Sequence, residues 1–184
     1  MKLTRFLSAL ALLAASCAPG GDLPPLPPDT AAAYRLGPGD AVRIITFGED
    51  ALTGEFRVGD SGAIALPLIG NVRAANLTPS ELEAAVANAL KRGGLLRAPS
   101  VSAEVIAYRP IFVLGEVNKP GQYAYQPGMT VVSAAAVAGG FTYRAIDSYA
   151  SVVRTTGGEA LEAKALRQSL VRPGDVITFY ERRF

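Results

Sequence analysis

The sequence contains Leu36-Gly37-Pro38-Gly39-Asp40 and, near its other end, Val171-Arg172-Pro173-Gly174-Asp175. In each stretch proline presets φ for a turn, glycine allows a positive φ, and aspartate can accept hydrogen bonds from the turn's own amides. Runs rich in β-branched residues follow at 41–47 and 176–180. The pattern predicts two turns that each lead into a strand. A catalytic or metal-binding role for Asp40 and Asp175 is the alternative, and the turn chemistry favours structural roles for Pro38, Gly39, Asp40, Pro173, Gly174 and Asp175.

The residues after the first turn predict short strands and one long helix. Residues 55–58, 63–66 and 67–72 read as strands separated by turn residues. Thr78-Pro79-Ser80-Glu81 has the pattern of a capping box with proline at the first helical position. The apolar residues that follow recur at helical spacing and end before a Gly-Gly pair; they are Leu82, Ala85, Val86, Ala89 and Leu90. A strand at 101–108 then completes a first unit.

The second half predicts a compact unit with one helix and several strands. Residues 111–117 and 122–125 flank Asn118-Lys119-Pro120-Gly121, which indicates a hairpin with Pro120 and Gly121 in its turn. Thr130 can cap a helix at 131–138, and further strands are expected at 151–155 and 176–180. A boundary falls at Arg109-Pro110. The fold class expected is therefore α+β.

The first sixteen residues have the features of a signal peptide. Lys2 and Arg5 precede an apolar run at 6–13 that is shorter than the roughly 17–25 residues of a membrane-spanning helix. Leu13-Ala14-Ala15-Ser16-Cys17 resembles a bacterial lipobox, with Ala14 where leucine is usual, so Cys17 is predicted to be the lipid attachment site. An ordinary signal peptide with a cysteine in its cleavage region is the alternative. Ala18 after the cysteine favours the outer membrane by the same resemblance.

A proline-rich segment follows the predicted lipidation site. Residues 17–33 contain Pro24-Pro25 and Pro27-Pro28 beside glycine and alanine. Such composition favours an extended polyproline II conformation of about 3.1 Å per residue. We expect a stalk that holds the folded part up to roughly 50 Å from the lipid.

Composition excludes several classes of function. The chain has no histidine and one cysteine, which removes the usual ligands of zinc and transition metals and the Ser/His/Asp and Cys/His catalytic arrangements. Of 18 lysines and arginines, two lie in the leader, so the remainder carries 16 basic and 16 acidic residues. These charges are scattered, which argues against nucleic-acid binding. We expect no catalytic residues, no metal and no cofactor; Glu49-Asp50 is more typical of a solvated turn than of a glycosidase pair.

The order of these motifs resembles a known family. Residues 34–40, 62–70 and 77–81 resemble the export domain of outer-membrane polysaccharide export lipoproteins. Residues 113–117, 119–121, 138–140 and 172–177 resemble the β-grasp soluble-ligand-binding domain that follows it in that family. The resemblance implies a small mixed-sheet export domain at 34–108 and a β-grasp-like domain at 109–184.

The resemblance also implies a function and a set of partners. It predicts a non-enzymatic, lipid-anchored outer-membrane protein that faces the periplasm and takes part in export of capsular polysaccharide or exopolysaccharide. Family members form homo-oligomeric rings that conduct the polymer, and a C-terminal helix crosses the membrane. Only nine residues follow Asp175 here, so a separate outer-membrane β-barrel is expected to supply the pore. An inner-membrane chain-length regulator or co-polymerase is the other implied partner.

The alternative function is a monomeric periplasmic lipoprotein that binds glycan or a partner without forming a conduit. Candidate rings for stacking on sugar belong to Tyr123, Tyr125, Tyr143 and Tyr149, although the alternation of strand residues favours burial for several of them. A conduit requires a closed ring with head-to-tail interfaces, whereas a binding module does not. Oligomeric state therefore discriminates the two functions.

Overall fold

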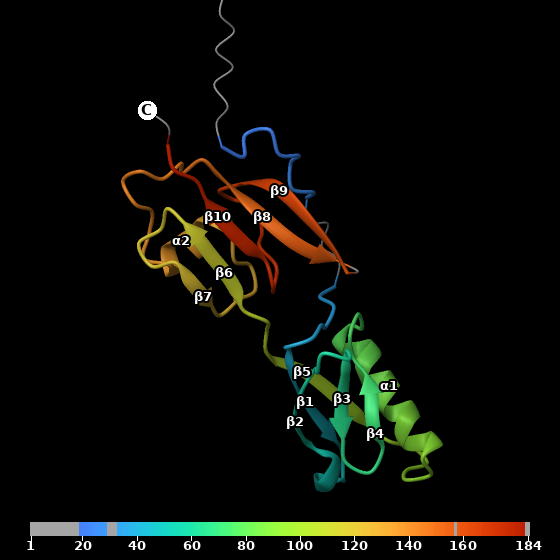
Figure 1. The fold of residues 1–184 in the computed structure, drawn as a ribbon. Coiled ribbons are helices and arrows are strands. Elements are labelled where there is room, and N and C mark those ends of the chain that lie inside the picture. Colours follow the sequence, from blue (N-terminus) through green and yellow to red (C-terminus); the bar gives the residue numbers. More distant parts are fainter. Residues whose placement is uncertain (1–18, 29–32, 157, 183–184) are drawn as a thin grey trace, which may run out of the picture.

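The computed structural model describes residues 19–28, 33–156 and 158–182, which form two domains stacked end to end (Figure 1). The predicted signal peptide and Cys17 lie outside the described residues. Residues 33–108 form the first domain, and residues from Ile111 onward form the second, with Arg109-Pro110 between them. Each domain has its own buried apolar core.

The first domain packs a helix and a hairpin on one face of a small antiparallel sheet. The sheet has the order β2-β1-β5, and β3 pairs with β4 in a separate hairpin. In β1 the buried residues are Val42, Ile44 and Thr46, whose period of two places them on the covered face. The elements of this domain are β1 (Ala41–Thr46), η1 (Asp50–Leu52), β2 (Gly54–Arg57), β3 (Ala63–Leu66), β4 (Gly70–Arg73), α1 (Pro79–Arg92) and β5 (Val101–Ala107).

The predicted capping box begins α1. The Thr78 hydroxyl accepts from the Glu81 amide at 3.2 Å, and the Glu81 carboxylate accepts from the Thr78 amide at 2.8 Å. Two of the helix's unpaired amino-terminal N–H groups are satisfied in this way. The buried residues of α1 are Leu82, Val86 and Leu90, which form one stripe against the core.

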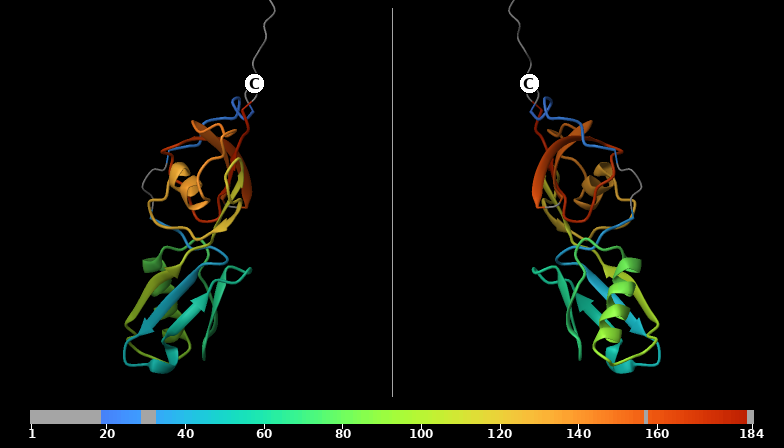
Figure 2. Two further views of the ribbon diagram at one scale, coloured as in Figure 1. Left: turned by 90° about the vertical axis from the view of Figure 1, so that its left-hand side faces the viewer. Right: turned by 90° about the vertical axis from the view of Figure 1, so that its right-hand side faces the viewer.

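The second domain is a curved five-stranded sheet around one short helix (Figure 2). The strand order is β7-β6-β10-β8-β9; β10 runs parallel to β6, and the other pairs are antiparallel. Helix α2 buries Val131, Ala134 and Ala135 against the sheet. Together the two domains confirm the predicted α+β class. The elements are β6 (Ile111–Gly115), β7 (Gly121–Tyr123), α2 (Val131–Val137), β8 (Tyr149–Thr156), β9 (Glu159–Leu166) and β10 (Val176–Phe179).

The structure differs from the prediction in one strand and one turn. Strand β9 was not predicted, because its sequence is dominated by alanine, glutamate, leucine and lysine, which favour helices. The β6–β7 hairpin is present, but Gly121 lies within β7 and pairs with Val113. The glycine with a positive φ in this region is Gly115, at 79°.

The proline-rich segment differs from the expected free stalk. Its described part, residues 19–28, runs along the second domain and pairs in parallel with β9 through Pro25 and Lys164 (Figures 1 and 2). The Leu26 amide donates to the Lys164 carbonyl at 2.7 Å, and the Lys164 amide donates to the Pro24 carbonyl at 2.8 Å. These backbone groups of Lys164 lie on the edge of β9 that does not pair with β8. The composition of the proline-rich segment does not predict pairing with that edge.

Candidate functional site at the domain joint

The first repeated turn buries its aspartate beneath the start of the second domain. Asp40 is fully buried, and its carboxylate accepts hydrogen bonds from the Gly37 amide at 2.7 Å and the Tyr34 hydroxyl at 2.6 Å. The Gly37 contact is the turn bond that the sequence predicted. Gly39 has a φ of 96°, a conformation that other residues rarely adopt. The turn thus places a buried negative charge at the end of the first domain.

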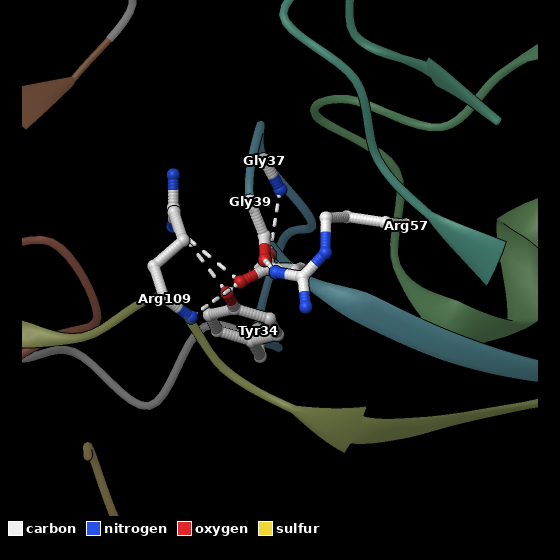
Figure 3. Close-up of polar contacts among 6 residues, drawn as sticks. Tyr34, Gly37, Gly39, Arg57 and Arg109 are labelled. Atoms are coloured by element: carbon white, nitrogen blue, oxygen red, sulfur yellow. Dashed lines mark hydrogen bonds and ion pairs between the residues drawn. The ribbon is translucent and has the colours of Figure 1, made fainter. Parts of the chain in front are cut away.

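Arg109, the last residue before Pro110, binds this buried carboxylate (Figure 3). Its backbone amide donates to Asp40 Oδ1 at 2.9 Å, and its Nε lies 3.5 Å from the same oxygen as an ion pair. Its Nη2 donates to the Tyr34 hydroxyl at 3.4 Å. The absence of a side chain at Gly37 makes room for the guanidinium, because a Cβ there would overlap Arg109 Nη1.

The second repeated turn uses the same chemistry with an arginine of its own domain. Asp175 is buried and accepts from the Arg172 amide at 2.7 Å. Arg154 in β8 donates to it twice, from Nε at 3.0 Å and from Nη2 at 2.7 Å, and also to the Leu170 carbonyl at 3.1 Å. This bidentate pair satisfies a carboxylate that would otherwise be costly to bury.

The two turns meet at the same linker. The Gly174 amide donates to the Pro110 carbonyl at 3.1 Å, and the Phe112 amide donates to the Asp175 carbonyl at 3.0 Å. A Cβ on Gly174 would lie 3.9 Å from Arg109 Nε. The linker is therefore held on one side by the turn at 37–40 and on the other by the turn at 172–175, and this fixes the place where the domains join.

A chain of three tyrosine rings crosses the joint. Tyr34 packs edge to face on Tyr108, with ring centroids 5.0 Å apart and planes at 79°. Tyr108 packs in the same manner on Tyr125 of the second domain, at 5.4 Å and 74°. Such pairs contribute about 0.5–1.5 kcal/mol each beyond the area that they bury. The rings therefore add a second connection beside the polar one.

The electrostatics of the joint suit a structural role. Burial raises the pKa of Tyr34 well above its ordinary value, and the hydrogen bond to Asp40 and the charge of that carboxylate raise it further. Arg109 opposes these effects. The Tyr34 hydroxyl therefore stays protonated and donates to Asp40 throughout the neutral range. Within the described residues, no group of three or more acidic or cysteine side chains could hold a metal ion.

The four tyrosines predicted as sugar contacts lie in different surroundings. Tyr123 donates to the Lys119 carbonyl, Tyr125 lies in the joint, and the Tyr149 hydroxyl donates to the Pro19 carbonyl at 2.9 Å. Tyr143 is 86% exposed. Among the described rings, no two of these four are in stacking contact. Any sugar contact by these residues remains a prediction.

Sequence reasoning missed the residues that complete the joint. Arg109 was assigned only to a boundary, and Arg154 only to a strand. The repeated turns give a partial indication. Each turn ends in an aspartate, and the one turn amide that donates to it leaves part of its hydrogen-bonding capacity unused. A buried carboxylate therefore needs further hydrogen-bond donors. The sequence does not say which arginine supplies them. Glu49 and Asp50, at the start of η1, lie outside the joint, and Asp50 is exposed.

Comparison with known protein families divides the chain at this joint. The family model described as "Polysaccharide biosynthesis/export protein" matches residues 28–106, and the SLBB domain model matches residues 110–163. The chain belongs to the polysaccharide export protein family. Its two domains are accordingly the export domain and the SLBB domain, and the sheet of the SLBB domain continues beyond the matched region to β10.

Several curated relatives share this sequence pattern. The chain is 36% identical over 142 residues to the exopolysaccharide production protein ExoF of Rhizobium meliloti (strain 1021). The aligned region covers 71% of this chain and 32% of that protein. It is 27% identical over 184 residues to the EPS I polysaccharide export outer membrane protein EpsA of Ralstonia nicotianae, and this alignment covers 81% of this chain and 48% of EpsA. The polysialic acid transport protein KpsD of Escherichia coli is 32% identical over 92 residues, covering 49% and 16%.

The extent of these matches bears on what the chain can do. The chain spans less than half the length of each of these relatives. Members of the family are export proteins and not enzymes, as the sequence predicted. Within the described part of the chain, no helix combines the length and the apolar composition that a membrane span requires.

Proposed function

We propose that this protein is a periplasm-facing outer-membrane lipoprotein that forms part of the conduit for export of an exopolysaccharide or capsular polysaccharide. Its family and the names of its relatives, which include an outer membrane export protein and a transport protein, support this role. The joint is the structural observation that carries the proposal. It fixes the export domain and the SLBB domain as one elongated unit, the kind of rigid part from which a conduit wall can be assembled.

We propose that Cys17 carries the lipid that attaches the protein to the outer membrane. The basic and apolar leader and the lipobox-like residues before Cys17 support this attachment. Mass spectrometry of the mature amino terminus should find an acylated Cys17, and Cys17→Ser should leave the protein unprocessed or released from membranes. An unmodified mature chain that begins elsewhere would contradict the proposal.

The protein is expected to work as a homo-oligomeric ring beside other transport components. A conduit requires head-to-tail interfaces that close, so copies of this elongated unit would stand side by side around the polymer. An inner-membrane chain-length regulator or co-polymerase would deliver the polymer, and a separate outer-membrane protein would complete the passage. Sedimentation of the acylated protein in detergent tests the ring, because a monomer at all concentrations would support the glycan-binding alternative instead.

Gene deletion tests the export role as a whole. A deletion strain should lose surface polysaccharide but continue to make the lipid-linked repeat unit, because the protein assists passage and does not build sugars. Unchanged surface polysaccharide would contradict the role in export. Loss of the lipid-linked repeat itself would place the protein in synthesis instead.

A further inference from the structure

The outward face of the SLBB sheet carries large apolar side chains. Helix α2 covers the inner face, where Ile111 and Val113 of β6 belong to the buried core. Residues at alternate positions of a strand point to opposite faces of the sheet, so Phe112 and Leu114 lie on the outward face. Phe112 is 39% exposed and Leu114 is 42% exposed. A solvated sheet face is usually polar, so this face differs from the common pattern.

The strand register joins these side chains into one patch. Phe112 of β6 pairs with Val176 of β10, and Val176 pairs with Val153 of β8. Directly paired residues of neighbouring strands share a face, so the three side chains form a continuous apolar row. We call Phe112, Leu114, Val153 and Val176 the sheet patch. An apolar patch left exposed on a soluble protein marks a surface that contacts another molecule.

The opposite side of the same domain is also apolar where it is exposed. Helix α2 turns Val131, Ala134 and Ala135 into the core. Ala136 and Val137 of the same helix are exposed, Val137 by 46%. The sheet curves around α2 on one side, so the exposed side of the helix faces away from the sheet (Figure 2). We call Ala136 and Val137 the helix patch.

Each patch has one charged side chain beside it, and the two charges are opposite. Glu162 of β9 pairs with Val153 and extends the apolar row at an exposed position. The side chain of Lys119 lies just beyond the end of α2, because a Cβ on Gly139 would lie 3.6 Å from Lys119 Cγ. Among the described residues, neither Glu162 nor Lys119 has an ion-pair partner within the chain.

We propose that the sheet patch of one copy packs against the helix patch of the next copy, with Glu162 of the first copy facing Lys119 of the second. One chain carries both complementary halves: an apolar row beside a carboxylate, and an apolar helix side beside an ammonium group. A second copy of this chain is therefore the occupant of both patches. This inference rests on the proposed function and assigns the surfaces through which neighbouring copies meet.

The position of the patches suits a closed ring. Both belong to the SLBB domain, so they lie at the same level along the long axis of the molecule (Figure 1). Contact between them requires no shift along that axis. Copies related by rotation alone can then repeat the contact until the ring closes, whereas a shift at each step would produce an open helix.

Thiol cross-linking tests whether the two patches meet between copies. Gln122→Cys places a thiol beside the sheet patch, since Gln122 is exposed and pairs with Phe112. Ala136→Cys places one in the helix patch. The acylated protein in detergent is treated with a short bismaleimide, and the parent protein is the control for Cys17. We expect no cross-link from either single variant, dimers from their mixture, and a ladder of higher oligomers from the double variant.

Charge reversal tests the pairing of Glu162 with Lys119. Glu162→Lys should reduce the cross-linked fraction in the mixture several-fold, and Lys119→Glu in the neighbouring copy should restore it. The matched control is Glu159→Lys, which makes the same charge change at an exposed position of β9 outside the row. It should leave the cross-linked fraction unchanged. Absence of rescue by Lys119→Glu would overturn the pairing of these two residues.

The remaining outcomes separate this inference from the proposed function. Dimers from Gln122→Cys alone would show that the sheet patch meets its own copy in the next molecule, which would overturn the head-to-tail contact. Protein that sediments as a ring but gives no cross-link in the mixture would overturn the assignment of the patches and leave the ring in place. Protein that sediments as a monomer would overturn the ring itself and, with it, this inference.

Discussion

The backbone amide of Arg109 donates to the buried carboxylate of Asp40, although 69 positions separate the two residues in the chain. A backbone amide has less conformational freedom than a side-chain donor, so this hydrogen bond fixes the path of the linker backbone. The second repeated turn fixes the other side of the same linker through Gly174 and Pro110. In each domain the repeated Pro-Gly-Asp sequence forms a turn with a buried aspartate. Together the two turns hold the linker at the joint.

Removal of the first buried carboxylate should destabilise the protein strongly. Asp40→Ala leaves the Gly37 amide, the Tyr34 hydroxyl and the Arg109 amide without their acceptor. We expect the free energy of unfolding to fall by about 3 kcal/mol, since buried donors to a charged group lose their partner. Urea denaturation measures the change. Asp60→Ala, at an exposed turn, is the control and should shift stability by less than about 0.5 kcal/mol. Equal effects would show that Asp40 is not structural.

The stability contributed by Tyr34 should depend on pH in the alkaline range. Folding raises the pKa of Tyr34, so its contribution is complete below the ordinary tyrosine pKa of about 10 and declines above it as the unfolded chain ionises. Tyr34→Phe should cost about 1.5 kcal/mol at pH 8, and the difference from the parent protein should shrink above pH 10. Denaturation midpoints of both proteins at pH 8 and above pH 10 provide the measurement. Tyr143→Phe, at an exposed position, should have little effect at pH 8; a difference for Tyr34→Phe that grows with pH would reverse the argument.

Two glycines of the SLBB domain should respond differently to the same substitution. Gly115 and Gly128 both have a positive φ, at 79° and 81°. A Cβ on Gly115 would overlap the Phe179 carbonyl in β10, whereas a Cβ on Gly128 would meet nothing within 4 Å. Gly128→Ala should therefore cost only the conformational term of about 1–2 kcal/mol, and Gly115→Ala should cost clearly more. Thermal unfolding of both variants tests this, and similar losses would contradict the β6–β10 packing.

The buried pair between Arg154 and Asp175 should depend on the shape of the guanidinium. Arg154→Lys keeps the charge but cannot supply both donors that contact the carboxylate. We expect a loss of about 2 kcal/mol, with a larger loss of about 3–5 kcal/mol for Arg154→Ala. The exposed pair of Arg167 with Asp147 is the control, and Arg167→Ala should cost less than about 1 kcal/mol. Full stability of Arg154→Lys in denaturation would show that one donor is sufficient.

Local patterns predicted most of the fold because the forces that set them act over a few residues. The capping box at Thr78 and Glu81 and the turn bond between Gly37 and Asp40 are contacts within four positions, and both are present. Strand β9 was missed because its composition favours a helix, and pairing with β8 overrides that preference.

Long-range contacts could not be predicted because they depend on how finished elements meet. The amino-terminal segment at residues 19–28 binds β9 only because that strand lies at the edge of the sheet, far along the chain from residue 19. Arg109 reaches Asp40 only because two separate turns converge on one linker. The joint and the pairing of residues 19–28 with β9 therefore could not be predicted from the sequence, although the turn residues that build the joint were predicted.

Surface polysaccharide per cell tests the central claim most directly, in a deletion strain that carries the parent gene or a variant at equal protein level. We predict that the deletion removes surface polysaccharide, that the parent gene and Asp50→Asn restore it, and that Asp40→Ala, which disrupts the joint, restores far less. Normal surface polysaccharide in the deletion strain would contradict the role in export. Loss of export by correctly folded Asp50→Asn would contradict it in a different way, since that exposed carboxylate lies outside the joint and would then have to act chemically.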